Sequence, residues 1–200
     1  MTSQNRWKDH YTDRAKEENW LARSVYKLEE IDKRHNIIRP GSRILDLGCY
    51  PGSWTQYCLK KAGKGGFVTG IDLQRPGRIQ AANFRFIEAD ILTFNPEEFA
   101  GEIKGMDAVI SDLAPQTTGV HITDVSRSMA LAEKALEIAC AVLKKGGGFV
   151  CKVFEGEDFK ALKDKASGSF NETRALRPSA VRKRSREVYL IGIKFTGAHT

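Results

Sequence analysis

A lysine inside an apolar run is the residue of this chain that packing alone explains least well. Residues 149–154 are otherwise typical of a buried strand, and Lys152 interrupts them. Burying a charged lysine is costly unless an acid pairs with it or the amine becomes neutral. A neutral amine can take a proton from a weak nucleophile, and a charged one can orient it. We therefore predict that Lys152 is functional, with Asp112 at the mouth of a neighbouring strand as its counter-charge.

Acidic residues end four of the short apolar runs in the sequence. The runs begin at residues 43, 67, 84 and 106, and the acids that close them are Asp46, Asp72, Asp90 and Asp112. Because the carboxyl ends of parallel strands open onto one crevice, we expect these four carboxylates to converge in space. Glu187, just before the last apolar run, could reach the same place, but from spacing alone an ordinary charge flanking a strand explains it equally well.

A glycine turn follows the first of these acids. Gly48 and Gly52 stand on either side of Pro51, and helical spacing resumes directly afterwards. Glycines at such a turn let the backbone approach a ligand, as in nucleotide crevices, and Asp72 is placed to hold ribose hydroxyls. The spacing is neither G-x-G-x-x-G nor that of a phosphate-binding loop. We predict a ligand that contains adenosine but no phosphates.

The order of these runs predicts an α/β fold with a mostly parallel sheet. All 200 residues are interpreted as one domain, because no Pro- or Ser-rich linker divides them. Lys27 falls on the first expected helix. The expected helices cover residues 22–35, 53–62, 124–143 and about 157–165, and the expected strands end at Asp46 or cover residues 67–73, 84–90, 106–112, 149–154 and 188–193.

The formal net charge of +7 indicates an anionic partner, which leaves nucleic acid, a membrane surface or an acidic protein. Two segments concentrate the cations. Residues 1–20 mix basic and aromatic side chains, among them Arg6 and Lys8, and are equally well interpreted as a charged tail. Residues 174–187 are interpreted as a loop that binds RNA phosphates through Arg177, Arg182, Lys183, Arg184 and Arg186.

Other classes of protein fit the sequence less well. The longest purely apolar run, residues 138–143, is too short to cross a membrane, so we expect a cytoplasmic protein without a membrane partner. Four cysteines without a C-x-x-C pair argue against disulfides and zinc, and no metal site is expected. We expect a monomer.

Five motifs together resemble the FtsJ/RrmJ (RlmE) family, the S-adenosylmethionine-dependent ribose 2′-O-methyltransferases of RNA. They occur in the family's order between about Trp7 and Phe195. One departure is Tyr50, because relatives carry Gly-Ala-Ala-Pro-Gly where this chain has a bulky tyrosine in the turn. The motifs are Ser24-Val25-Tyr26-Lys27-Leu28, Asp46-Leu47-Gly48-x-x-Pro51-Gly52-x-Trp54, Ser111-Asp112-x-Ala114-Pro115, Cys151-Lys152-Val153-Phe154 and Ser185-Arg186-Glu187-Val188-Tyr189.

The resemblance implies a Rossmann-like methyltransferase fold with helices on both faces of the sheet and an antiparallel edge strand, which residues 188–195 can supply. It implies a catalytic tetrad of Lys27, Asp112, Lys152 and Glu187. It also implies that S-adenosyl-L-methionine is held by Asp46, Gly48, Gly52, Trp54, Asp72, Asp90 and Asp112, with Asp72 on the ribose hydroxyls and Asp90 on the adenine amine. Whether Lys152 removes the hydroxyl proton or only orients the oxygen depends on which of its charged neighbours dominates.

The basic segments resemble those of the bacterial ribosomal-RNA branch of the family. The resemblance therefore implies a uridine of 23S ribosomal RNA in the large (50S) subunit as the target, with ribosomal RNA as the partner. Transfer RNA is the alternative substrate. Two other classes remain open: a non-catalytic RNA-binding module on the same fold, and a small-molecule methyltransferase or nucleotide-dependent oxidoreductase.

Overall fold

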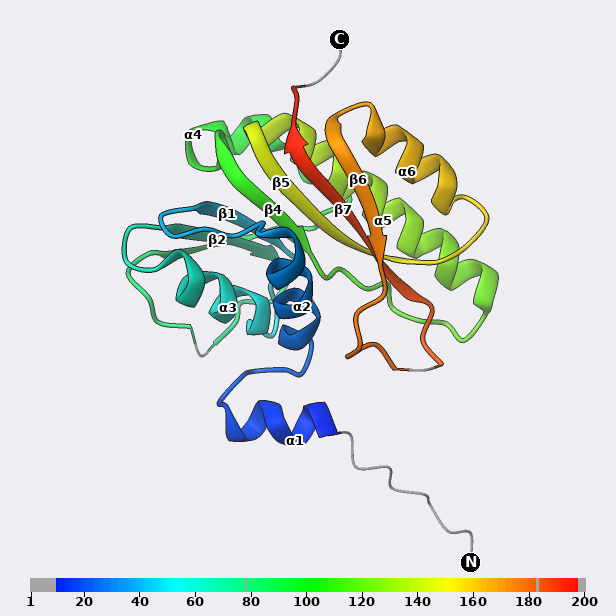
Figure 1. The fold of residues 1–200 in the computed structure, drawn as a ribbon, viewed down its shortest axis with the longest axis horizontal. Helices are drawn as coiled ribbons and strands as arrows, with labels where there is room; N and C mark the ends of the chain where they lie inside the picture. The colour runs from blue at the N-terminus through cyan, green and yellow to red at the C-terminus, as the bar shows by residue number, and fades with distance from the viewer. Residues whose placement is uncertain (1–9, 78, 183, 198–200) are drawn as a thin grey trace, which may run out of the picture.

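The computed structural model describes residues 10–77, 79–182 and 184–197, and these form a seven-stranded mixed sheet (Figure 1). The strand order is β3-β2-β1-β4-β5-β7-β6. Strands β1 to β5 pair in parallel, and β7 runs antiparallel to both of its neighbours. The strands are β1 (Arg43–Leu47), β2 (Phe67–Asp72), β3 (Phe84–Glu88), β4 (Met106–Ser111), β5 (Leu143–Phe154), β6 (Phe170–Leu176) and β7 (Glu187–Phe195).

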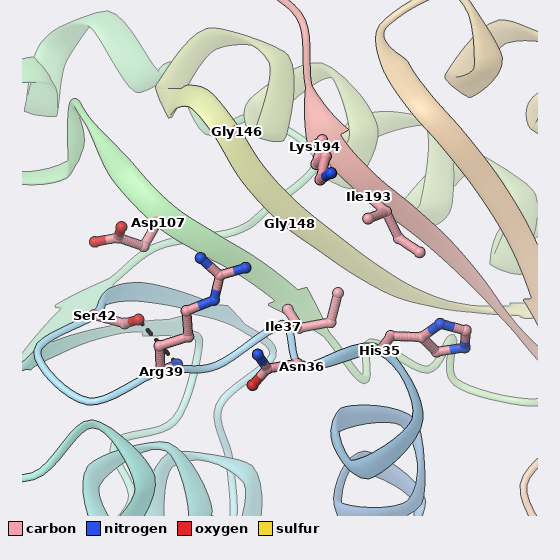
Figure 2. Close-up of a pocket in the computed structure, with 10 residues that line it drawn as sticks. All are labelled: His35, Asn36, Ile37, Arg39, Ser42, Asp107, Gly146, Gly148, Ile193 and Lys194. Carbon is pink, nitrogen blue, oxygen red and sulfur yellow. Dashed lines mark hydrogen bonds between the residues drawn. The ribbon is translucent and has the colours of Figure 1, made fainter.

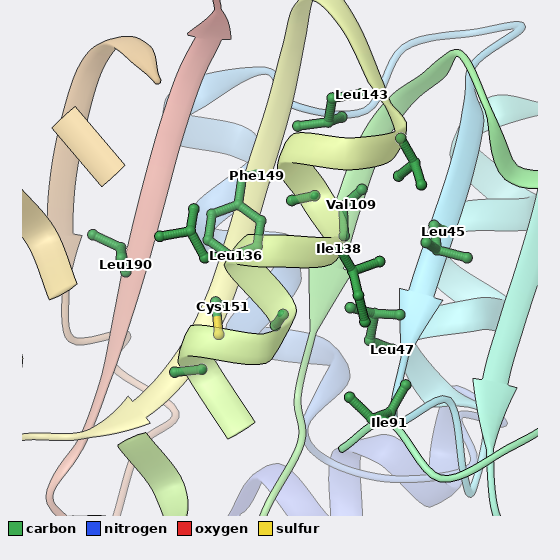
Figure 3. Close-up of a cluster of buried hydrophobic side chains, with 14 of the residues drawn as sticks. Leu45, Leu47, Ile91, Val109, Leu136, Ile138, Leu143, Phe149, Cys151 and Leu190 are labelled. Carbon is green, nitrogen blue, oxygen red and sulfur yellow. The ribbon is translucent and has the colours of Figure 1, made fainter. Parts of the chain in front are cut away.

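Helices cover both faces of the sheet, as predicted. Alternate strand residues divide between the two faces: Val109 packs toward α5 and α6, whereas Ala108 and Ile110 pack toward α2 and α3. Figure 3 shows Leu136 and Ile138 of α5 against the first of these faces. The helices are α1 (His10–Glu17), α2 (Val25–His35), α3 (Ser53–Ala62), α4 (Ala100–Ile103), α5 (His121–Val142) and α6 (Phe159–Ser167), with a 3-10 turn η1 (Pro96–Phe99).

The basic segment corrects one expectation. Residues 174–187 are not wholly a loop, because Arg174 lies in β6 and Glu187 begins β7. The prediction missed β6 because the strand is polar at the edge of the sheet, where only Phe170 is buried. Residues 188–195 do run antiparallel, but β6 pairs with their outer side, so β7 is second from the edge.

Two further expectations can be compared with the described residues. Residues 10–17 are helical, so this part of the N-terminal segment is α1 and not a frayed tail. All four cysteines are free thiols, in agreement with the expected lack of disulfides. In the part of the chain that the structure covers, no group of side chains could hold a metal ion, and no helix is long and apolar enough to span a bilayer.

Candidate active site

Four charged side chains from four elements form two ion pairs at the carboxyl end of the parallel strands. Lys27, on α2, lies 2.6 Å from the Glu187 carboxylate at the start of β7, measured from Nζ to Oε2. Lys152, in β5, lies 3.3 Å from Asp112, measured from Nζ to Oδ1, and its Nζ also donates to the Asp112 backbone carbonyl at 3.1 Å. The sheet therefore brings the predicted tetrad together, and the expected counter-charge of Lys152 is confirmed.

Both lysines of the tetrad are buried. Lys27 is 7% exposed and Lys152 is 6% exposed. A long cation so far from water needs a carboxylate partner, because desolvation alone would exclude its charge. Each lysine has one carboxylate, so the cluster is balanced in charge. Lys152 Nζ contacts two acceptors, and both belong to Asp112.

Tyr189 links the two ion pairs, a role that was not predicted from the sequence. Its hydroxyl donates to Asp112 Oδ1 at 2.9 Å, and Lys27 Nζ lies 5.9 Å from the centre of its ring. Burial and the neighbouring carboxylates raise the pKa of Tyr189 well above its ordinary value, so the hydroxyl remains a donor. The available signal was its spacing: Tyr189 follows Glu187 by two residues, which places both on the same face of β7.

Trp54 packs beside Tyr189. The two rings lie 5.9 Å apart, and the indole N–H donates to the Ser24 carbonyl at 2.9 Å. Trp54 is only 3% exposed, so it connects the start of α3 to the residue before α2 and to β7. The structure gives it this packing role, and the contact with cofactor that we expected for it remains a prediction.

The glycine turn after β1 has a backbone conformation and surroundings that favour glycine, and the expected approach of its backbone to a ligand remains a prediction. Gly48 has φ 78° and Gly52 has φ 117°, a left-handed backbone that side chains disfavour. A Cβ on Gly52 would lie 2.7 Å from Ile79 Cδ1 and 2.8 Å from Leu21 Cδ1, and one on Gly48 would lie 2.7 Å from Leu113 Cδ2. Protein atoms therefore fill the space beside these two glycines. The left-handed backbone of the turn and the protein atoms around it therefore both disfavour a side chain at these two positions.

Tyr50, the departure from the family pattern, directs its bulk outward. Its side chain is 53% exposed. Its backbone N–H donates to Asp72 Oδ2 at 2.9 Å, which ties the turn to the end of β2. The tyrosine therefore does not fill the interior of the turn, and any effect on cofactor binding would come from the rim of the site.

Two of the carboxylates that were expected to converge, Asp72 and Asp112, act on Asp46 of β1, whereas Asp90 is not among the groups that do so. Asp46 is fully buried; its Oδ2 accepts a hydrogen bond of 2.6 Å from Thr55, and its Oδ1 has no partner among the described residues. Burial raises the pKa of Asp46 to about 7, and Asp112 and Asp72 contribute to the rise. Asp90, after β3, is exposed and accepts from the Leu92 N–H at 2.9 Å.

This edge fits an adenosine carrying a sulfonium group. Ribose hydroxyls and the adenine amine are donors, and the carboxylates at the strand ends are acceptors. The unpartnered Asp46 Oδ1 is a buried acceptor, and exposed Asp90 is available at the outer rim. The acidic character of the edge also suits a positively charged ligand.

Asp46 should make stability depend on pH. Its folded pKa of about 7 exceeds the ordinary 3.8, so its contribution is complete below pH 4 and is lost as the pH rises toward 7 and above. An asparagine cannot ionise, so between pH 4 and 8 we expect the free energy of unfolding of Asp46→Asn to fall by about 2–4 kcal/mol less than that of wild type. The measurement is chemical denaturation of both proteins between pH 4 and 8. Parallel stability curves for wild type and variant would contradict the prediction, since other titrating groups are common to both.

The basic segment lies next to the tetrad through Glu187. Arg177, Arg182, Arg184 and Arg186 are all exposed, and Arg177 also donates within the segment to the carbonyls of Ser185 and Glu187. The RNA contacts expected for these four arginines remain predictions. The predicted RNA-binding residues Arg6, Lys8 and Lys183 lie outside the described residues.

Comparisons with known proteins match this chain to methyltransferases. A family model described as FtsJ-like methyltransferase matches residues 20–195. The ribosomal RNA large subunit methyltransferases E of Desulfosudis oleivorans and Bdellovibrio bacteriovorus are each 46% identical to this chain, over 92% and 93% of it and over 89% and 96% of their own lengths.

Solved structures show the same fold. A Plasmodium falciparum protein described as a ribosomal RNA methyltransferase superimposes with a TM-score of 0.78 at 27% identity, over 90% of this chain and 100% of that one. Fibrillarin of Aeropyrum pernix, solved with bound S-adenosyl-L-methionine, has a TM-score of 0.59 at 16% identity, over 78% of this chain and 68% of that one. At that identity the likeness to fibrillarin concerns the fold alone.

Proposed function

The chain belongs to the FtsJ-like methyltransferase family and uses S-adenosyl-L-methionine, and we propose that it methylates a ribose 2′-hydroxyl of large-subunit ribosomal RNA. The observation that carries this proposal is the buried cluster of Lys27, Asp112, Lys152 and Glu187 beside the glycine turn. The names of relatives that cover nearly the whole chain support the large subunit as substrate. A uridine of 23S ribosomal RNA is the proposed target.

The ends of β1, β2 and β3 form the proposed cofactor half of the site. Asp72 would hold the ribose hydroxyls, Asp90 the adenine amine, and the backbone from Gly48 to Gly52 would follow the methionine portion. When bound, S-adenosyl-L-methionine supplies an electrophilic methyl group. Asp112 lies between this half and Lys152, so one carboxylate connects the cofactor side with the substrate side.

The tetrad forms the proposed RNA half of the site. A ribose hydroxyl is a weak nucleophile near neutral pH, so it must be held in line and lose its proton as the new bond forms. We assign the proton to Lys152 Nζ, which must first become a neutral amine. Asp112 positions that amine, and Tyr189 holds the Asp112 carboxylate in turn. The Lys27–Glu187 pair closes the other side of the cluster.

The exposed arginines of the segment before Glu187 would bind phosphates of the RNA at the mouth of this half. Such contacts fix where the strand lies but do not read its sequence. We further propose that the protein acts as a monomer in the cytoplasm.

The proposed substrate can be tested by methyl transfer. The purified protein and labelled cofactor are incubated with undermethylated large subunits, free ribosomal RNA and bulk transfer RNA. We expect label in the large subunits, at a uridine 2′-oxygen, and none in transfer RNA. Label confined to transfer RNA would support the alternative substrate and overturn ours. RNA binding without any methylated product would instead indicate a non-catalytic module.

A further inference from the structure

Two adjoining hollows lie at the opposite end of the sheet from the tetrad. Their volumes are about 240 Å³ and 440 Å³, and both are lined by Arg39, Gly146 and Lys194. They lie among the connection from α2 to β1, the amino ends of β4 and β5, and the carboxyl end of antiparallel β7. Figure 2 shows the Arg39 guanidinium extending from the α2–β1 connection toward β5, with Lys194 beyond it on β7.

The charge of these hollows is positive. Arg39, Lys145 and Lys194 are exposed, and in the part of the chain that the structure describes no acid pairs with their side chains. The acid in the lining, Asp107, is already engaged. It lies 2.5 Å from Lys144 and accepts from the Arg43 N–H at 2.9 Å. Three cations therefore face one pair of hollows without a matching negative charge.

The backbone around the hollows leaves room for a ligand. Gly146 has φ 84°, and an added Cβ there would meet nothing within 4 Å. Lys194 has φ 57°, a conformation that non-glycine residues rarely adopt, and its side chain lines both hollows. The backbone of Arg39 is held by the Ser42 hydroxyl, which accepts its N–H at 3.1 Å. Arg39 and Lys194 thus project from anchored segments.

We propose that this amino-edge site, defined by Arg39, Lys145 and Lys194, binds backbone phosphates of the RNA substrate at a second position. A pair of adjoining cationic hollows suits consecutive phosphates of a nucleic-acid strand. The inference rests on the proposed function, because it assigns the site to the same RNA.

The distance to the tetrad determines what this second contact can do. Tyr189 of β7 pairs with Lys152, and five residues of β7 separate it from Lys194, which at about 3.4 Å per residue is about 17 Å. A short strand whose ribose reaches Lys152 need not extend to the amino-edge site. A folded substrate with a second segment on the far side of the protein can. The site should therefore increase affinity for a large subunit and not for a short fragment that contains only the target uridine and its neighbouring nucleotides.

The test is the double variant Arg39→Glu/Lys194→Glu, measured with undermethylated large subunits and with the short fragment. We expect KM for the subunits to rise at least about 5-fold with kcat unchanged within about 2-fold, and KM for the fragment to stay the same. For binding to the subunits, the slope of the logarithm of the binding constant against the logarithm of the salt concentration should become shallower by about one to two. Each lost phosphate contact removes about 0.9 from this slope. The matched control is Lys160→Glu/Lys165→Glu on α6, which changes the net charge equally at two exposed residues.

Several outcomes would overturn the proposal. Equal weakening by the control pair would show an effect of net charge alone, and equal weakening for the fragment would place the contact near the tetrad. Unchanged binding of the double variant to the subunits would show that Arg39 and Lys194 do not contact the RNA. Thermal melting checks that each variant folds. If Arg39→Glu/Lys194→Glu does not fold, the milder Arg39→Gln/Lys194→Gln replaces it. If wild type transfers no methyl group, filter binding to subunits without cofactor still tests the site. A failure of the proposed function can therefore be distinguished from a failure of the amino-edge site.

Discussion

Lys152→Ala is expected to lower kcat about 10²–10⁴-fold, which is the range that a positioned proton acceptor contributes. The side chain projects from a buried strand toward Asp112, and the other amine of the tetrad, Lys27, is paired with Glu187. Cofactor binding should persist, because the expected cofactor residues follow other strands. Stabilisation of the variant by S-adenosyl-L-methionine in thermal melting provides that control.

The pH dependence of kcat distinguishes the two roles of Lys152. A general base can accept the hydroxyl proton only as a neutral amine, whereas an orienting cation must stay charged. We therefore expect log kcat of wild type to rise with a slope of about one on the acidic limb, and the residual activity of Lys152→Ala to lack that slope. A flat profile, together with substantial activity of Lys152→Arg, would show that a cation at this position only orients the hydroxyl.

The strands that carry the site could be predicted because each is buried on both faces and ends in a polar residue. This pattern identified β1, β2 and β4, the apolar run around Lys152 identified β5, and together they placed Asp112 and Lys152 at neighbouring strands. Strand β6 escaped detection because an edge strand with one buried residue carries neither an apolar run nor an apolar alternation. Its last three residues, 174–176, were consequently assigned to the basic loop, and the edge of the sheet was placed one strand too early.

The identity of the site residues was easier to predict than their connections. Charged side chains in or after apolar runs are conspicuous, so Asp112 and Lys152 could be paired from the order of the residues alone. Tyr189 is an aromatic residue in an apolar strand. Its residue type does not distinguish a tyrosine whose hydroxyl bridges charged groups from one that only packs in the core. Gly52 was recognised, but its backbone angle and its approach to Ile79 and Leu21 depend on segments distant in sequence.

Glu187→Ala is expected to destabilise the protein strongly, because it leaves Lys27 buried without a partner. The side chains of the pair are 9% and 18% exposed for the lysine and the glutamate, so solvent can compensate for little of the loss. We expect a decrease of about 2–4 kcal/mol in the free energy of unfolding, measured by chemical denaturation. The control is Glu29→Ala on the same helix as Lys27, whose pair with Lys33 is solvent-exposed and should cost less than about 1 kcal/mol.

Replacing both members of the pair separates its structural role from its part in the reaction. In Lys27→Met/Glu187→Leu no charge is left buried, so stability should return to within about 1 kcal/mol of wild type. Activity should remain at least about 10²-fold lower, because a hydroxyl held even about 1 Å out of line loses that much rate. If the stable double variant recovered methyl transfer, the pair would be only an ion pair of the core. If it stayed inactive while binding both RNA and cofactor, the loss would lie in the alignment of the hydroxyl beside Lys152.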